Sequence, residues 1–259
     1  MKINGLPEII AIAAVLVVGA FVIARGHPST GDNVLASYGT DLSQRTPHQR
    51  YNARRAAAAV DGIVIKPGGS FSFDDVLHGW TADQGFLKAP VSYDGTLIDD
   101  YGGGVCETST TIYNAALLAG LPIVERHSHS FSPSYAPPGR DAAVAYPSAD
   151  LRFTNPYKWP ITLHVRPWGD RLVCRIQALQ APTDAVRLRA QILGRRTPAE
   201  APVQPGVGMH RSRWQIRGRD GLRVAIFRTW YEGGNPVRME QVSDDTYLPI
   251  SRVSWSTSR

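Results

Sequence analysis

Cysteine is scarce in this chain, with two residues among 259, and metal-site spacings such as HExxH or CxxC do not occur. Two cysteines cannot build a disulfide scaffold or a cysteine-rich zinc module. The sequence has one long apolar run, which excludes a polytopic membrane protein. Hydrophobic residues make up 43% of the chain and charged residues 19%, which excludes disorder over its bulk. The length predicts one large domain with a small annex.

The apolar run covers residues 9–24, close to the amino terminus. At about 1.5 Å per residue, such a helix is near the lower limit for crossing a bilayer of roughly 30 Å. Residues 1–25 therefore predict either an uncleaved anchor, with Lys2 on the cytoplasmic side, or a signal peptide cleaved after small residues at 18–20. We favour the anchor because the cleavage signal is weak. Both alternatives place the protein outside the cytoplasm, membrane-attached or secreted, with residues 26–46 as a polar linker.

The net charge of +6 belongs to the carboxyl-terminal part of the chain. Residues 1–180 hold 15 basic and 15 acidic residues, whereas residues 181–259 hold 13 arginines, no lysine and 7 acidic residues. A basic surface at this end predicts contact with anionic wall polymers or lipid headgroups. Nucleic acid is not an expected partner, because the domain is predicted to lie outside the cytoplasm.

Periodicity and turn residues predict an α+β domain over residues 47–180. One helix begins at Thr46-Pro47, and a second runs from about Thr108 to Ala119 before Gly120. Apolar alternation predicts strands at residues 63–65, 71–73, 123–124, 142–146, 151–153, 161–165 and 172–176, and a hairpin over residues 89–99. We expect a mixed, mostly antiparallel sheet with the cysteine-bearing helix packed on it. Residues 181–259 are expected to form a small β-rich extension.

Cys106 follows three glycines and begins the second helix. The unpaired amides and partial positive charge of a helix N-terminus favour a thiolate, which is the nucleophilic form of cysteine. The glycines allow close approach of a substrate, and the flanking N–H groups could stabilise an oxyanion. A buried, inert cysteine is the alternative, but the histidines that follow favour a nucleophile.

Two histidines, His127 and His129, follow the next strand and face the same side of it. Either could accept the thiol proton, and spacing alone does not choose between them. Asp141, or less favourably Glu125, could orient the imidazole. A cysteine on a helix N-terminus followed by a histidine and an acid is analogous to papain-like and transglutaminase-like enzymes.

Cys174 shares one strand face with Leu172 and Ile176, which predicts a core position. Outside the cytoplasm a disulfide between Cys106 and Cys174 is the alternative, and it would remove the nucleophile.

Residues 38–180 resemble the VanW family of bacterial envelope proteins. The resemblance is carried by Gly102-Gly103-Gly104-Val105-Cys106, Ser109-Thr110-Thr111, residues 113–121, Val124-Glu125-Arg126, His129-Ser130 and Gly139-Arg140-Asp141-Ala142, with Pro67-Gly68, Phe71-Ser72-Phe73, Thr81 and Gly85 upstream. The resemblance implies a cysteine acyltransferase that forms 3-3 cross-links in peptidoglycan, the L,D-transpeptidase reaction. It also makes His129 the better base than His127, with Asp141 or Arg140 in support. No cofactor and no metal is expected.

Peptidoglycan stem peptides are thus the expected substrate, and an amine or water could be the acyl acceptor. The residues expected to bind substrate surround the cysteine and histidine motifs: Gly103, Gly104, Thr108, Ser109, Ser130 and Arg140. Glu107 stands where the family pattern usually has Gln, and an adjacent carboxylate would raise the pKa of Cys106. The alternative function is a non-catalytic wall-binding or glycopeptide-resistance accessory protein, in which the basic end with its aromatic residues grips anionic polymers.

Overall fold

The computed structural model describes residues 33–93, 96–199, 204–205, 218–251 and 255–256. Its elements, in chain order, are β1 (Asn33–Asp41), α1 (Pro47–Val60), β2 (Val64–Ile65), β3 (Ser70–Ser72), α2 (Phe73–Leu77), β4 (Lys88–Tyr93), β5 (Thr96–Tyr101), α3 (Val105–Leu118), β6 (Ile123–Glu125), β7 (Arg152–Thr154), β8 (Ile161–Trp168), β9 (Arg171–Ala178), β10 (Ala185–Arg196), β11 (Gln204–Pro205), β12 (Gly221–Glu232), β13 (Asn235–Tyr247) and β14 (Trp255–Ser256). The predicted anchor over residues 1–25 lies outside the described residues. Within the described part, no helix has the length and apolar character needed to span a bilayer.

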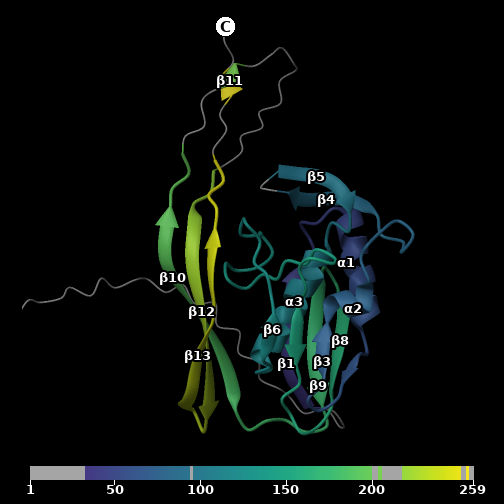
Figure 1. Ribbon diagram of the computed structural model, residues 1–259, viewed down its shortest axis with the longest axis vertical. Helices are drawn as coiled ribbons and strands as arrows, with labels where there is room; N and C mark the ends of the chain where they lie inside the picture. Colours follow the sequence, from purple (N-terminus) through teal and green to yellow (C-terminus); the bar gives the residue numbers. More distant parts are fainter. Residues whose placement is uncertain (1–32, 94–95, 200–203, 206–217, 252–254, 257–259) are drawn as a thin grey trace, which may run out of the picture.

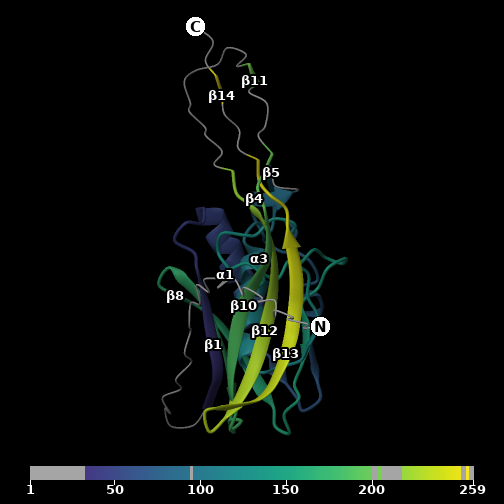
Figure 2. The same ribbon diagram turned by 90° about the vertical axis from the view of Figure 1, so that its left-hand side faces the viewer.

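Most strands pair antiparallel, and few helices accompany them, in agreement with the expected α+β class. The sheets have the orders β1-β9-β8-β2, β3-β7-β6, β4-β5 and β10-β12-β13, and β11 pairs with β14 in parallel. Figure 1 shows the helices and the first sheets as one body, with the long β10-β12-β13 sheet standing alongside it. Figure 2 shows the strands of this C-terminal sheet from its outer side.

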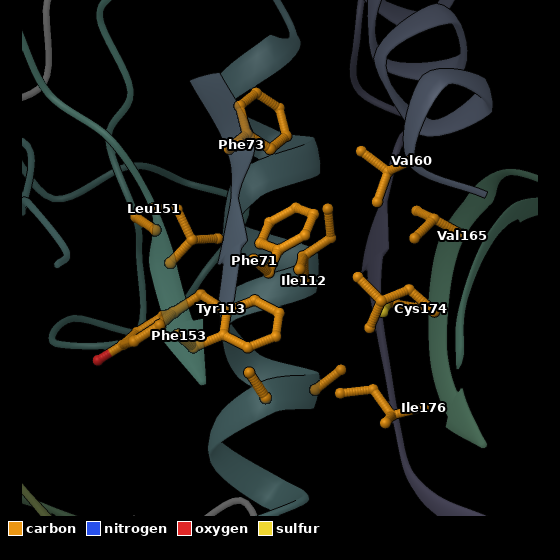
Figure 3. Packing of buried hydrophobic residues seen from close by; sticks show 14 of the residues in the cluster. Val60, Phe71, Phe73, Ile112, Tyr113, Leu151, Phe153, Val165, Cys174 and Ile176 are labelled. Atoms are coloured by element: carbon orange, nitrogen blue, oxygen red, sulfur yellow. The ribbon is translucent and has the colours of Figure 1, made fainter. Parts of the chain in front are cut away.

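Helix α3 is the centre of the body. Figure 3 shows it between Phe71 and Phe153 on one side and Cys174 and Ile176 on the other, which come from β3, β7 and β9. Nearly every side chain of α3 is buried, including Ile112 in the middle of the helix. A helix that is enclosed on all sides holds its terminal residues in fixed positions, because repacking it would disturb both layers.

The two long helices begin at different kinds of cap. Thr46 caps α1 through its side chain, Gln49 completes a capping box, and Pro47 occupies the first helical position, as its fixed φ allows. Gly104 caps α3 with φ of 108°, a conformation that favours glycine, and no side chain caps this end. The α3 N-terminus therefore keeps unpaired amides.

Three local predictions are corrected by the structure. Residues 33–41, expected within the linker, form β1, which pairs with β9. Phe73 begins α2 instead of continuing the strand, because Ser72 accepts a hydrogen bond from Asp75 N–H and caps a helix there. Residues 142–146 are not a strand: only isolated bridges form, at Ala143 and Ala145.

The C-terminal sheet is tied to the body near both ends of α3. Arg228 of β12 donates to the carbonyl oxygen of Leu121 (2.7 Å) just beyond the C-terminus of α3. Near the N-terminus, Leu248 N–H donates to the Ser130 carbonyl (2.8 Å). Arg228 is buried, and its charge is balanced by Glu240 on β13. These contacts bring the sheet next to the histidine segment.

Candidate active site

Cys106 is the second residue of α3 and is half-buried. Its Sγ donates to the Val144 carbonyl oxygen at 3.5 Å. In the first turn, the amides of Val105 and Glu107 donate to the carbonyls of Gly102 and Gly104. The Cys106 amide between them has no acceptor among the described residues. This N–H is therefore free to bind a developing oxyanion.

The glycines before Cys106 serve packing. A side chain at Gly103 would meet the Pro90 carbonyl oxygen at 2.7 Å and the Ala89 Cβ at 2.9 Å, both on β4. A side chain at Gly104 would meet the Gln49 carbonyl oxygen of α1 at 2.3 Å. The two glycines thus let α1 and β4 approach the start of α3. The substrate-binding role of Gly103 and Gly104 stays a prediction.

An isolated antiparallel bridge explains why His129 lies next to Asp141. His127 pairs with Ala143, and the Ala143 N–H donates to the His127 carbonyl oxygen at 2.8 Å. In antiparallel pairing, the next pair on the same face consists of His129 and Asp141. His129 Nδ1 lies 2.6 Å from Asp141 Oδ2, which also accepts the His129 backbone N–H at 2.8 Å.

Hydroxyls of α3 hold the acid-bearing segment against the helix. Ser109 Oγ donates to the Ala142 carbonyl oxygen at 2.7 Å, and the Ala142 N–H donates to Thr110 Oγ1 at 2.9 Å. Ser109 lies one turn after Cys106 on the helix. The segment next to Asp141 is thereby fixed relative to the thiol.

The electrostatics of Cys106 and His129 are coupled. Burial raises the pKa of Cys106, but the hydrogen bond and charge of the His129 imidazole outweigh it, and the pKa of the thiol is lowered. Burial lowers the pKa of His129, but Asp141 and the Cys106 thiolate raise it to about 10. Both shifts favour transfer of the thiol proton to the imidazole, and a thiolate–imidazolium pair is the reactive state of a cysteine nucleophile.

Asp141 is fully buried, and its carboxylate stays ionised. Burial raises its pKa, but His129 and Arg126 lower it further than burial raises it. Arg126 lies 3.1 Å from Asp141 Oδ1 and 2.5 Å from Asp245 Oδ1. Tyr247 also donates to Asp141 Oδ1, at 2.5 Å. Sequence reasoning assigned no site role to Arg126 or Asp245, and it counted Tyr247 only among the aromatic residues of the basic end. Arg126 stands inside the histidine motif, whereas the two β13 residues carry no sequence signal of their contact.

His127 lies apart from this arrangement. Its Nε2 is 2.9 Å from Glu125 Oε1, and 46% of its side chain is exposed. Glu125 therefore binds His127 and does not orient the His129 imidazole. The tertiary structure brings together Cys106, His129 and Asp141, and leaves His127 and Glu125 outside.

The other predicted substrate-binding residues have mixed positions. Thr108 and Ser109 are fully buried, and Thr108 donates to the Ala53 carbonyl oxygen at 3.0 Å, so both hold the structure around Cys106, and their contact with substrate stays a prediction. Arg140 is held by Asn114, and its guanidinium lies 5.3 Å from the centroid of the Tyr38 ring. Ser130 is exposed beside His129 and remains a predicted contact.

Three further side chains border the site. The Tyr135 hydroxyl lies 3.4 Å from His129 Nε2, and the Arg45 guanidinium lies 5.0 Å from the Tyr135 ring centroid. Arg45 Nε is also 2.9 Å from Glu107 Oε2. Burial raises the pKa of Glu107 to about 7, although Arg45 opposes the shift. The Glu107 carboxylate thus faces Arg45, and the largest influences on the pKa of Cys106 are burial and His129.

Cys174 occupies the core position predicted for it. Both cysteines are free, and Cys174 is fully buried, which raises its pKa well above the ordinary value. The disulfide alternative is therefore not present in this structure.

A groove of about 390 Å³ lies elsewhere, on the outer face of β8 and β9. It is lined by His164, Arg166, Pro167, Trp168, Val173, Arg175 and Gln177. No member of the cysteine–histidine–aspartate arrangement lines it.

The comparison with known families supports the motif. The family model described as VanW-like protein matches residues 48–177, which hold Cys106, His129 and Asp141. The chain belongs to the VanW family. The VanW match ends before β10, so Tyr247 and Asp245 lie outside it.

Two relatives support this VanW assignment. The chain is 37% identical over 139 residues to the uncharacterized protein YoaR of Bacillus subtilis, covering 54% of this chain and 46% of that protein. It is 28% identical over 110 residues to the vancomycin B-type resistance protein VanW of Enterococcus faecalis, covering 40% of each. The chain thus matches less than half the length of either relative. No solved structure matches it.

Proposed function

We propose that this VanW protein is a cell-envelope cysteine acyltransferase that acts on peptidoglycan stem peptides. The observation that carries the proposal is the Cys106 thiol beside His129, whose imidazole is fixed by the buried Asp141. A nucleophile, a base and a group that orients the base are the three parts that acyl transfer through a thioester requires.

In the first half-reaction, the Cys106 thiolate attacks the carbonyl carbon that precedes the terminal D-residue of a donor stem. The carbon–nitrogen bond breaks, the His129 imidazolium gives its proton to the leaving amine, and the terminal D-amino acid departs. A Cys106 thioester remains. The free Cys106 amide at the positive end of α3 is suited to stabilise the tetrahedral oxyanion.

In the second half-reaction, an acceptor attacks the thioester carbonyl and His129 takes its proton. A side-chain amine of a neighbouring stem gives a 3-3 cross-link, the L,D-transpeptidase reaction. Water gives carboxypeptidase-like hydrolysis. In both cases the thiolate is the leaving group and the enzyme returns to its starting state, without cofactor or metal.

The choice of substrate rests on context. The apolar segment before the domain favours export, with an anchored extracytoplasmic protein as the proposed form. One relative is named as a vancomycin resistance protein. The resemblance of the Cys106 motif to the VanW family implies peptidoglycan chemistry, so a stem peptide is the substrate class that we propose here.

The decisive experiment is the intact mass of the protein after incubation with purified muropeptides, together with analysis of the products. We expect a thioester adduct and a cross-linked or shortened stem with wild type and with Cys174→Ser, and neither with Cys106→Ala. If all three proteins leave the muropeptides unchanged and carry no adduct, the proposal fails.

A second candidate is favoured by the exposed face of β10. Arg187 and Arg189 lie over the rings of Tyr231 and Phe227, 4.6 and 5.0 Å from the centroids, and neither pairs with an acid among the described residues. Exposed arginines without an acidic partner among the described residues can bind anionic wall polymers. A non-catalytic wall-binding or resistance accessory protein would use this face and would not need Cys106.

A further inference from the structure

We infer that Tyr247 is a positioning residue for Asp141, and that the C-terminal sheet is thereby a working part of the active site. The sheet's residues lie outside the VanW match, where a separate binding module would be the simplest interpretation. The inference rests on the proposed function only in taking Cys106 as the nucleophile.

Tyr247 ends β13 with its phenol inside the protein, and 2% of the residue is exposed. The hydroxyl donates to Asp141 Oδ1 and accepts the Gly139 N–H at 2.7 Å. The Tyr247 hydroxyl thus binds both the Asp141 carboxylate and the backbone N–H two residues before it. Because the donor and the acceptor belong to one short segment, the phenol fixes both the position and the rotation of Asp141.

The two oxygens of Asp141 have separate partners. Oδ1 is held by Tyr247 and Arg126, whereas Oδ2 accepts both the ring Nδ1 and the backbone N–H of His129. Rotation of the carboxylate away from His129 would break the Oδ1 contacts. Tyr247 therefore acts on the imidazole through Asp141, although it does not touch the ring.

A second residue of the same strand face supports this arrangement. Asp245 lies two positions before Tyr247, so both side chains point to the same side of β13. Asp245 Oδ1 is bound by Arg126, and its Oδ2 accepts from Ser243 Oγ at 2.9 Å. Arg126 thus bridges the carboxylates of Asp141 and Asp245, and holds the segment that leads to His129 against β13.

The segment before Asp141 packs closely against the C-terminal sheet and leaves no room for a side chain at Gly139. Gly139 has φ of +83°, and a Cβ at this position would meet Ile226 of β12 at 2.7 Å. The backbone therefore lies directly on the C-terminal sheet. This contact explains how the phenol of Tyr247 reaches the Gly139 amide.

Several charged or titratable groups surround Asp141, and each can contribute to the pH dependence that is tested. His129 and Arg126 come from the segment after β6, and Asp245 and Tyr247 come from β13. Cys106 and Tyr113 come from α3, the charge of Asp141 raises the pKa of each, and Arg126 lies over the Tyr113 ring at 5.3 Å. Among them, Tyr247 is the neutral donor whose hydroxyl can be removed without changing the charge of the cluster.

The test is the pH profile of Cys106 alkylation in a Cys174→Ser background. With Tyr247→Phe we expect the apparent pKa of Cys106 to rise by about one unit, and the alkylation rate below that pKa to fall about tenfold. Tyr157→Phe is the matched control, because its phenol donates to the Ala119 carbonyl oxygen (2.6 Å) at the other end of α3. Its profile should match that of the parent.

The Arg228→Met variant distinguishes the positioning of Asp141 by the Tyr247 hydroxyl from a general effect of the attachment of the C-terminal sheet. It loosens the sheet at the Leu121 carbonyl without touching Asp141. If Arg228→Met or Tyr157→Phe raises the pKa as much as Tyr247→Phe, the hydroxyl has no specific role and the inference is overturned. An unchanged profile in Tyr247→Phe overturns it as well.

A second variant keeps the test open if Tyr247→Phe does not fold. Gly139→Ala disturbs the same contact from the other side, because its Cβ pushes against Ile226. We expect the pKa of Cys106 to rise here too, and an unchanged profile in the folded variant would contradict the inference. Alkylation needs no peptidoglycan, so this result is independent of whether the protein transfers acyl groups.

Discussion

His129 Nδ1 lies 2.6 Å from Asp141 Oδ2, and the same oxygen accepts the His129 backbone N–H at 2.8 Å. The carboxylate therefore fixes the ring relative to its own peptide and occupies Nδ1. Nε2 is left as the nitrogen that can exchange a proton with Cys106, with the Tyr135 hydroxyl 3.4 Å away. Loss of a proton from the thiol and gain of one by the imidazole form a single coupled titration.

Alkylation of wild type against pH should give an apparent pKa for Cys106 below the ordinary value of about 8.5, because the imidazolium stabilises the thiolate. Cys174 should not react in the folded protein, since burial keeps it a thiol. The Cys174→Ser variant should therefore give the same profile. An ordinary pKa in both proteins would contradict the ion pair.

His129→Asn should raise the pKa of Cys106, because it removes the group that chiefly lowers it. It should also slow acyl transfer by about 100- to 10,000-fold, the usual contribution of a positioned base. His127→Asn is the control, since His127 is bound to Glu125 at the surface. Equal losses in both variants would show that the structure has assigned the wrong histidine.

Asp141→Asn should destabilise the protein at pH 7 by about 3 to 5 kcal/mol, because Arg126 would lose one partner of a buried ion pair. The folded pKa of Asp141 is lowered, so its contribution is present above the unfolded pKa and is lost as pH falls through the folded pKa. Urea unfolding of both proteins should show their stabilities converging in acid. A constant difference across this range would contradict the ionised carboxylate.

Glu107→Gln should stabilise the protein above pH 7. The folded pKa of Glu107 is raised from 4.5 to about 7, so the stability it contributes is complete below its unfolded pKa and is lost as pH rises through the folded pKa. The variant does not titrate, and its advantage over wild type should grow across this window to on the order of 2 kcal/mol. Denaturant titrations at pH 5 and pH 8 measure the difference in unfolding free energy between the two proteins. A larger advantage of the variant at pH 5 would contradict the raised pKa of Glu107.

Replacing Arg187 and Arg189 by Gln should weaken binding to purified cell wall if the outer face of β10 holds anionic polymers. The loss should be greatest at low salt, because exposed charges are screened as ionic strength rises. Cys106→Ala should bind like wild type in the same sedimentation assay. Unaltered binding by the double arginine variant would remove the observation behind the wall-binding candidate.

Short-range sequence signals were sufficient to predict several structural features. Thr46-Pro47 predicted the start of α1, and Gly120 predicted the end of α3, since caps depend on residues within one turn. Alternation placed Cys174 in the core, where it is fully buried. Phe73 was misassigned because the cap at Ser72 is stabilised by Asp150, which is distant in sequence.

The residues alone predicted that a cysteine begins a helix packed on a sheet, that two histidines and an acid follow it, and that the chain resembles the VanW family. These are properties of spacing, capping and motif. Only the tertiary structure selected His129 over His127, because the antiparallel bridge at His127 and Ala143 sets His129 opposite Asp141. It alone brought Tyr247 to that carboxylate, since a contact across 106 positions depends on how the C-terminal sheet packs against the segment that holds Asp141, and leaves no periodic trace in the sequence.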